Sequence, residues 1–148
     1  MIAVALSGGV DSSAAALCLR ENGETITGIT LYLGEKNPGP DKIDRAAGLC
    51  RHLGVPHHVL DIREEFHAVK RYFCREYLSA RTPNPCALCN RDIKFGLLLH
   101  KALPLGAQLL ATGHYVRKGF SQGRHFLMRA REMKSQEYFL GLVSQSSI

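Results

Sequence analysis

Short apolar runs alternate along the chain with longer stretches in which apolar residues recur at helical spacing. Residues 2–6, rich in Ile, Val and Ala, suit a buried strand, and a stretch of alanines and leucines follows soon after. The same alternation continues to about residue 112. We therefore predict strands over residues 2–6, 25–33, 57–62 and 108–112, and helices over residues 14–19, from Asp41 or Asp44 to Leu53, over residues 64–78 and over residues 92–103.

The order of these elements, β-α-β-α-β-α-α-β, predicts the fold class. It implies an α/β three-layer sandwich in which a mainly parallel sheet carries helices on both faces. Ligands of such sheets bind at the carboxyl ends of the strands. The 148 residues suffice for a single domain over residues 1–148 and leave no room for a second full domain. Residues 35–40 read as a Gly/Pro-rich loop, and beyond Gly113 the pattern is less regular, apart from a helix expected over residues 136–143.

Composition narrows the setting of the protein. Five cysteines, an odd number scattered along the chain, do not form a secreted disulfide framework, so reduced thiols are expected. Nothing resembles a signal peptide or a membrane span, and we therefore predict a cytoplasmic protein. The formal net charge of +6 favours a polyanionic partner, of which nucleic acid is the simplest choice.

The junction between the first strand and the first helix reads Ser-Gly-Gly-Val-Asp-Ser-Ser at residues 7–13 and predicts a pyrophosphate cradle. Gly8 and Gly9 allow the backbone to approach an anion closely, and the helix that follows presents free N–H groups and its positive dipole end. Neighbouring serines can add hydroxyl donors. Asp11 can hold a hydrated magnesium ion beside the phosphates.

The same junction excludes two common phosphate-binding motifs. A Walker loop would carry a lysine that reaches the outer phosphates, and a dinucleotide fingerprint would space its glycines differently. The segment resembles instead the PP-loop of the N-type ATP pyrophosphatases, which cleave ATP to AMP and pyrophosphate. A glycine turn without any ligand stays the alternative.

A second informative stretch covers residues 80–96 and contains a Cys-x-x-Cys pair. Its two prolines argue against a regular helix before Cys86. We expect Cys89 to lie at a helix N-terminus, where the dipole together with Arg91 and Lys94 would lower the pKa of its thiol, as for a nucleophile. A structural zinc site is the alternative, although this pair supplies only two ligands.

Four ordered motifs together resemble the tRNA-specific 2-thiouridylases. Beside the PP-loop, residues 81–95 are similar to that family's Arg-Thr-Pro-Asn-Pro-x-x-x-Cys-Asn-x-x-Ile-Lys-Phe signature, residues 111–115 match its Ala-Thr-Gly-His-Tyr turn, and residues 134–140 approximate its Lys-Asp-Gln-Ser-Tyr-Phe-Leu. The resemblance runs from Met1 to about Gln145 and implies the adenine nucleotide alpha hydrolase-like (HUP) fold. It covers only the nucleotide-binding domain of that family.

The resemblance also implies a reaction and its residues. ATP would adenylate the O2 atom of a tRNA uridine, and sulfur would then enter at C2 with release of AMP. Cys89 matches the family's nucleophile, and Cys86 and Asp11 are the other candidate catalytic residues. The implied ATP-binding residues are Ala5, Leu6, Ser7, Gly8, Gly9, Val10, Asp11, Ser12, Leu31 and Gly113, and the implied RNA-binding residues are Asn84, Pro85, Cys86, Lys134, Ser135 and Gln136.

Several departures from the family pattern leave alternatives open. The family's second catalytic cysteine and its two further domains lie beyond this sequence, so the resemblance implies a fragment, a shortened relative or one subunit of a split enzyme. The chain would need a persulfide donor protein and, in the last case, a second subunit. Cys86 and Ser135 each stand where many members carry an aspartate. The Cys86/Cys89 pair could therefore pass sulfur between two thiols or join a third cysteine around an iron–sulfur cluster. Another adenylating PP-loop enzyme, or a non-catalytic module that binds ATP or RNA, is the alternative function.

Overall fold

The structure is a computed structural model that describes residues 1–34, 39–131 and 133–148. It divides into two compact units, which we describe separately: residues 1–64 with 99–113, and residues 65–98 with 114–148. The loop expected over residues 35–40 lies mostly outside the described residues. No helix in the described part of the chain is both long enough and apolar enough to cross a membrane.

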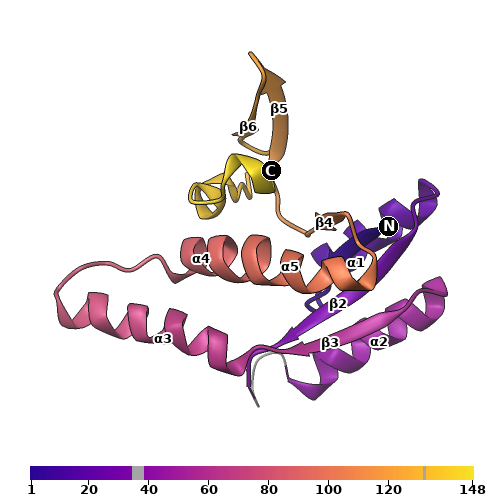
Figure 1. Cartoon of the computed structure of the whole chain (residues 1–148), viewed down its shortest axis with the longest axis horizontal. Coiled ribbons are helices and arrows are strands. Elements are labelled where there is room, and N and C mark those ends of the chain that lie inside the picture. The colour runs from indigo at the N-terminus through magenta and orange to yellow at the C-terminus, as the bar shows by residue number, and fades with distance from the viewer. Residues whose placement is uncertain (35–38, 132) are drawn as a thin grey trace. The chain divides into compact units, whose positions relative to one another are not determined.

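The first unit is built on a four-stranded sheet (Figure 1). Its strands are β1 (Ile2–Ala5), β2 (Ile26–Tyr32), β3 (His57–Asp61) and β4 (Leu109–Ala111), in the order β3-β2-β1-β4. All three pairings are parallel. Each strand lies within one or two residues of its predicted bounds, and the predicted parallel sheet is confirmed.

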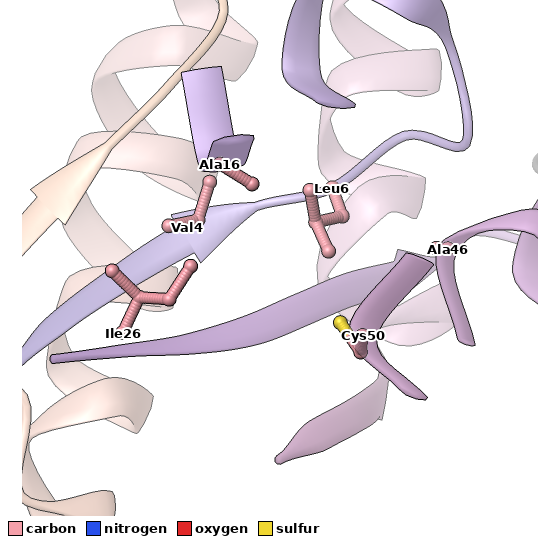
Figure 2. Close-up of a cluster of buried hydrophobic side chains, with 6 residues drawn as sticks. All are labelled: Val4, Leu6, Ala16, Ile26, Ala46 and Cys50. Atoms are coloured by element: carbon pink, nitrogen blue, oxygen red, sulfur yellow. The ribbon is translucent and has the colours of Figure 1, made fainter. Parts of the chain in front are cut away.

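Helices α1 (Val10–Glu21) and α2 (Pro40–Leu53) pack on this sheet through a small apolar core. Figure 2 shows the members of this cluster: Val4, Leu6, Ala16, Ile26, Ala46 and Cys50. Gly28 makes the close packing of α2 possible, because a Cβ atom there would lie 2.5 Å from Cys50 Sγ and 2.7 Å from Leu6 Cδ1. Each fully buried aliphatic side chain contributes about 1.5–3 kcal/mol to folding.

The ends of α2 test two sequence predictions. Gly54 ends the helix as expected, in the left-handed conformation with φ of 64°. The predicted N-cap at Asp41 or Asp44 is wrong, because Gly39 is the N-cap and Pro40 the first helical residue. Proline suits that position, since its fixed φ is helical and its missing N–H has no intrahelical partner there.

The second unit contains most of α3 (Arg63–Leu78) and the start of a second helical run. This run comprises α4 (Pro85–Leu88), the π-helix η1 (Cys89–Leu98), α5 (Leu99–Ala102) and the 3₁₀ turn η2 (Leu103–Leu105), of which α5 and η2 belong to the first unit. The predicted start at Asp92 is therefore seven residues too late. Pro85 again occupies the first helical position instead of breaking the helix, and Asn84 caps it.

The remainder of the second unit contains a ribbon that the sequence did not predict. Strands β5 (Arg117–Ser121) and β6 (Arg124–Met128) pair antiparallel around Gln122 and Gly123, which both have positive φ (Figure 1). Two short 3₁₀ helices follow, η3 (Glu137–Leu140) and η4 (Gln145–Ser147). The helix expected over residues 136–143 is thus reduced to a single 3₁₀ turn.

Candidate functional site

The glycine-rich loop lies at the carboxyl end of β1 and leads into α1, where the sequence places it. Gly8 has φ of +71°, and a Cβ atom on it would lie 2.8 Å from the Cα and the carbonyl carbon of Lys42 in the first turn of α2. A side chain at this position is excluded both by the backbone conformation and by the neighbouring backbone. The loop can therefore present its own backbone at close range, as an anion cradle requires.

Serine side chains brace the loop from within. The Ser12 hydroxyl donates to the carbonyl of Gly9 at 3.1 Å and accepts from the backbone N–H of Ser7 at 3.2 Å, and the Ser13 hydroxyl donates to the same carbonyl at 2.9 Å. Ser12 is only 5% exposed, whereas Ser7 is exposed. The first role of Ser12 and Ser13 is thus to hold the loop, and the Ser7 hydroxyl shares a hydrogen bond of 3.2 Å with the Ser12 hydroxyl.

The first turn of α1 offers backbone N–H groups as hydrogen-bond donors beside the loop. Gly9 is the N-cap and makes no side-chain capping hydrogen bond, and Val10 is 84% exposed. The first N–H groups of a helix have no intrahelical partner, and with the positive dipole end they favour an anion. Asp11 lies in this turn, partly buried.

Gly113 and Leu31 lie on the same edge of the sheet as the loop. A Cβ atom on Gly113 would lie 2.8 Å from the carbonyl carbon of Asp11 and from the backbone nitrogen of Ser12, so glycine allows the end of β4 to approach α1. Leu31 lies near the carboxyl end of β2 and pairs with Leu60. The structure thus gathers the predicted nucleotide-binding residues at the carboxyl ends of β1, β2 and β4.

A metal ion at this edge of the sheet would be held largely by water and by the phosphates of a bound nucleotide. Among the described residues, no group of three or more His, Cys, Asp or Glu side chains is arranged to hold one. Asp11 is the carboxylate of the loop itself. A single carboxylate fits magnesium, which keeps several waters and is commonly bound through one or two carboxylates and substrate phosphates.

The two cysteines of the second stretch differ in their surroundings. Cys86 is exposed in the first turn of α4, whereas Cys89 is partly buried at the start of η1. Burial raises the pKa of the Cys89 thiol, and Cys86 and Asp92 add to this effect, while Lys94 opposes it. The predicted lowering of this pKa is wrong. The Arg91 guanidinium is paired with Asp92 at 2.6 Å, and Cys89 follows a complete helical turn instead of opening the helix.

Within the second unit, one hydrogen bond links the helical run that follows Asn84 to the 3₁₀ turn that follows Gln136. Asn84 accepts at Oδ1 from the backbone N–H of Ala87 at 3.1 Å and so caps α4, which Pro85 begins. Asn90, 2% exposed, donates from Nδ2 to the carbonyl of Phe139 at 3.1 Å. Phe139 belongs to η3, and Gln136 is the N-cap of that turn. The helical run that carries Cys89 is therefore tied to the segment that carries Gln136.

Residues 134–136 are in turn fixed to Tyr115. The backbone N–H of Gln136 donates to the carbonyl of Tyr115 at 2.8 Å, and Gln136 Oε1 accepts from the N–H of Tyr115 at 3.0 Å. The Lys134 ammonium lies 4.6 Å from the centre of the Tyr115 ring. Ser135 accepts from the N–H of Ala130 at 2.8 Å and donates to Glu137. These bonds join the Ala-Thr-Gly-His-Tyr turn to the last motif.

His114 is a residue to which the sequence gave no role. Burial, with a smaller contribution from Lys94, lowers the pKa of His114 to about 4, so the ring is neutral at pH 7. Its ring centre lies 6.2 Å from that of Phe95. The signal that could have singled it out is its place in the Ala-Thr-Gly-His-Tyr turn.

Comparison with known proteins shows the family of this chain. A family model described as the tRNA methyl transferase HUP domain matches residues 1–148. The chain belongs to this family. The HUP domain is 44% identical over 151 residues to the tRNA-specific 2-thiouridylase MnmA of Syntrophomonas wolfei, a match that covers 99% of this chain and 44% of the relative. The resemblance drawn from the four motifs is confirmed, and the chain spans less than half the length of the curated relatives it matches.

Solved structures support the fold. The HUP domain is similar to the U34-tRNA thiolase NcsA of Methanococcus maripaludis, described with its [4Fe-4S] cluster, with a TM-score of 0.54 and 26% identity over 76% of this chain and 37% of that one. It is also similar to the glutamine-dependent NAD+ synthetase of Acinetobacter baumannii, with a TM-score of 0.53 and 19% identity over 74% of this chain and 20% of that one. The second likeness bears on the fold alone. The predicted HUP fold class is confirmed.

Proposed function

We propose that this HUP domain binds and activates ATP for the thiolation of a uridine in tRNA. The observation that carries the proposal is the loop at the carboxyl end of β1. Gly8 and Gly113 allow neighbouring backbone to approach this loop and the first turn of α1, and the N-terminus of α1 has no side-chain cap. The 44% identity to a tRNA-specific 2-thiouridylase supports the choice of tRNA as acceptor.

The first step is transfer of AMP to the substrate. The O2 atom of the uridine attacks the α-phosphate of ATP, and the bond to pyrophosphate breaks. The N–H groups of the first turn of α1 stabilise the charge on the departing pyrophosphate. Asp11 would hold a magnesium ion together with the phosphates, and this ion would supply further charge neutralisation.

The second step is replacement of the activated oxygen by sulfur. Cys89, as a thiolate, takes the outer sulfur of the donor protein's persulfide, and the donor thiolate leaves. The terminal sulfur of the Cys89 persulfide attacks C2 of the uracil ring, and the C2–O2 bond breaks as AMP leaves with the oxygen. Attack of the Cys86 thiolate on Cys89 Sγ then breaks the S–S bond, which releases 2-thiouridine and leaves a Cys86–Cys89 disulfide for an external thiol to reduce. Because burial raises the pKa of Cys89, the charge on Lys94 is the local contribution that favours its thiolate.

An iron–sulfur cluster held by this chain alone is a poor fit to its residues. Cys86 and Cys89 provide two thiols, whereas the described residues offer no group of three potential ligands. Four cysteines usually hold such a cluster. We therefore assign the pair to thiol chemistry and propose that a persulfide donor protein supplies the sulfur.

The chain covers 44% of a relative named tRNA-specific 2-thiouridylase. A second subunit that supplies the functions of the uncovered part is therefore a proposed partner. A domain that binds ATP or RNA without turnover is the second candidate function, which the same partial coverage favours.

Mass spectrometry of nucleosides tests the proposal. Unmodified tRNA is incubated with anaerobically purified protein, ATP, magnesium and a persulfide donor, and 2-thiouridine is measured. We expect 2-thiouridine with the wild-type chain and with Cys74→Ser, which removes another exposed thiol, and none with Cys89→Ser. ATP:pyrophosphate exchange, with and without tRNA, separates the candidates: exchange supports an adenylating domain, and its absence despite ATP binding supports the binding module.

A further inference from the structure

The positive charge of the chain is concentrated in one segment. Residues 114–136 contain six lysines and arginines and one acidic residue, whereas the rest of the chain contains thirteen basic and twelve acidic residues. The net charge of +6 is therefore almost entirely a property of these 23 residues. The segment covers the β5–β6 ribbon and the residues that connect it to η3.

A hollow of about 360 Å³ lies at the base of the ribbon, within the second unit. Arg117, the first residue of β5, and Arg131, three residues beyond the end of β6, both line it and are exposed. Neither arginine forms an ion pair within the described part of the chain. The other lining residues are His114, Tyr115, Val116 and Ala130.

The surroundings of the hollow keep its charge positive. His114 is neutral at pH 7, and Tyr115 carries the Lys134 ammonium over its ring, 4.6 Å from the ring centre. The carboxylate of Glu137 accepts a hydrogen bond from Ser135, and this bond, together with the charge of Arg129, lowers the pKa of Glu137. Arg117 and Arg131 thus line one concave surface, and the hydrogen bonds between Gln136 and Tyr115 fix part of its wall.

We propose that this hollow binds a phosphodiester group of the tRNA backbone through Arg117 and Arg131. The inference rests on the tRNA substrate proposed above and adds a binding site to it. The planar guanidinium donates two parallel hydrogen bonds to phosphate oxygens, which suits arginine to this ligand. A chain of phosphates is favoured over a single anion because Lys118 and Arg124 continue the positive charge along the ribbon beyond the hollow.

Salt-dependent binding of unmodified tRNA tests the site. The dissociation constant is measured for the whole chain across a series of KCl concentrations, with Arg117→Gln and Arg131→Gln as test variants. Arg51→Gln is the matched control, since it removes the same charge from an exposed residue in the last turn of α2, outside the hollow and the ribbon. Circular dichroism checks that each variant is folded. ATP and inorganic phosphate are titrated in parallel as sources of free phosphate.

We expect each test variant to weaken tRNA binding roughly tenfold and to reduce the slope of log Kd against log[KCl] by about 0.7–0.9, the value for one lost phosphate contact. The control should change the slope by less than half of that. Equal effects of all three variants, a loss confined to ATP or phosphate binding, or no tRNA binding by the wild type would each overturn the site. Formation of 2-thiouridine together with unchanged slopes would refute the site and leave the proposed function standing.

Discussion

Replacing Gly8 by alanine would test whether the loop is built as the structure describes. Gly8 has φ of +71°, and the added Cβ atom would lie 2.8 Å from the Cα and the carbonyl carbon of Lys42. The left-handed conformation costs a non-glycine residue about 1–2 kcal/mol, and forcing an extra carbon against backbone costs about 1–3 kcal/mol. The stiffer unfolded chain returns about 0.4–1 kcal/mol. The free energy of unfolding should therefore fall by about 2–4 kcal/mol.

Gly23→Ala is the matched control for this change. Gly23 also has positive φ, +81°, but nothing lies within 4 Å of the position of its Cβ atom. This variant should lose only the conformational part, about 1 kcal/mol. Urea denaturation followed by circular dichroism gives both values, and calorimetric titration with ATP and magnesium should show weaker binding for Gly8→Ala alone. Equal losses of stability in the two variants would refute the close approach of α2 to the loop.

Four further substitutions test other parts of the molecule by the same denaturation assay. Gly96→Ala should destabilise the protein by about 1–3 kcal/mol, because its Cβ atom would lie 2.9 Å from a carbonyl oxygen of η1. Gly48→Ala in α2, where the Cβ atom would lie at an ordinary contact distance of 3.7 Å from Arg51 Nη2, should stabilise it by about 0.5–1 kcal/mol. The free energy of unfolding should decrease as the pH falls from 6.5 to about 4, because the pKa of His114 is lowered on folding and the unfolded chain takes up the proton first. His114→Gln lacks this titration. After allowance for the partial exposure of the ring, the decrease should be about 1–2 kcal/mol larger in the wild type than in this variant. Asn90→Ala should lose about 1–3 kcal/mol by removing the bond to Phe139, and an unchanged midpoint would contradict that bond.

The sheet and its first helices could be predicted because local patterns and tertiary packing agree there. Residues 2–6 are apolar, as a strand covered by helices requires, and β1 occupies four of them. The helical periodicity before Gly54 is followed by a glycine that the left-handed C-cap needs, so α2 ends where predicted. The loop at residues 7–13 could be placed because its position depends only on the order of the first strand and helix.

The second unit could not be predicted as well, because its structure depends on contacts between distant segments. The environment of Cys89 is set mainly by burial within the folded unit, which the local sequence does not reveal. The β5–β6 ribbon is exposed, so its strands lack a continuous apolar face. Its turn at Gln122 and Gly123 offered a signal, since two residues of positive φ connect paired strands, but Gln-Gly is a weaker turn signature than Asn-Gly.

The loop motif alone does not define the reaction, because the loop lies in the first unit and the candidate sulfur and RNA residues lie in the second. Within residues 7–13, Gly8 fixes the path of the backbone, Ser12 and Ser13 brace it, and the anion would be held mainly by N–H groups that any helix start provides. Such a cradle can activate ATP for many acceptors. Under the proposed function, we therefore expect the choice of acceptor to come from the second unit, where Asn90 joins the cysteine-bearing helix to η3 and where the excess of positive charge lies. A substitution in the loop should accordingly affect every adenylation that the chain can perform, whereas a substitution at Cys89 or Arg117 should affect only steps that involve sulfur or RNA.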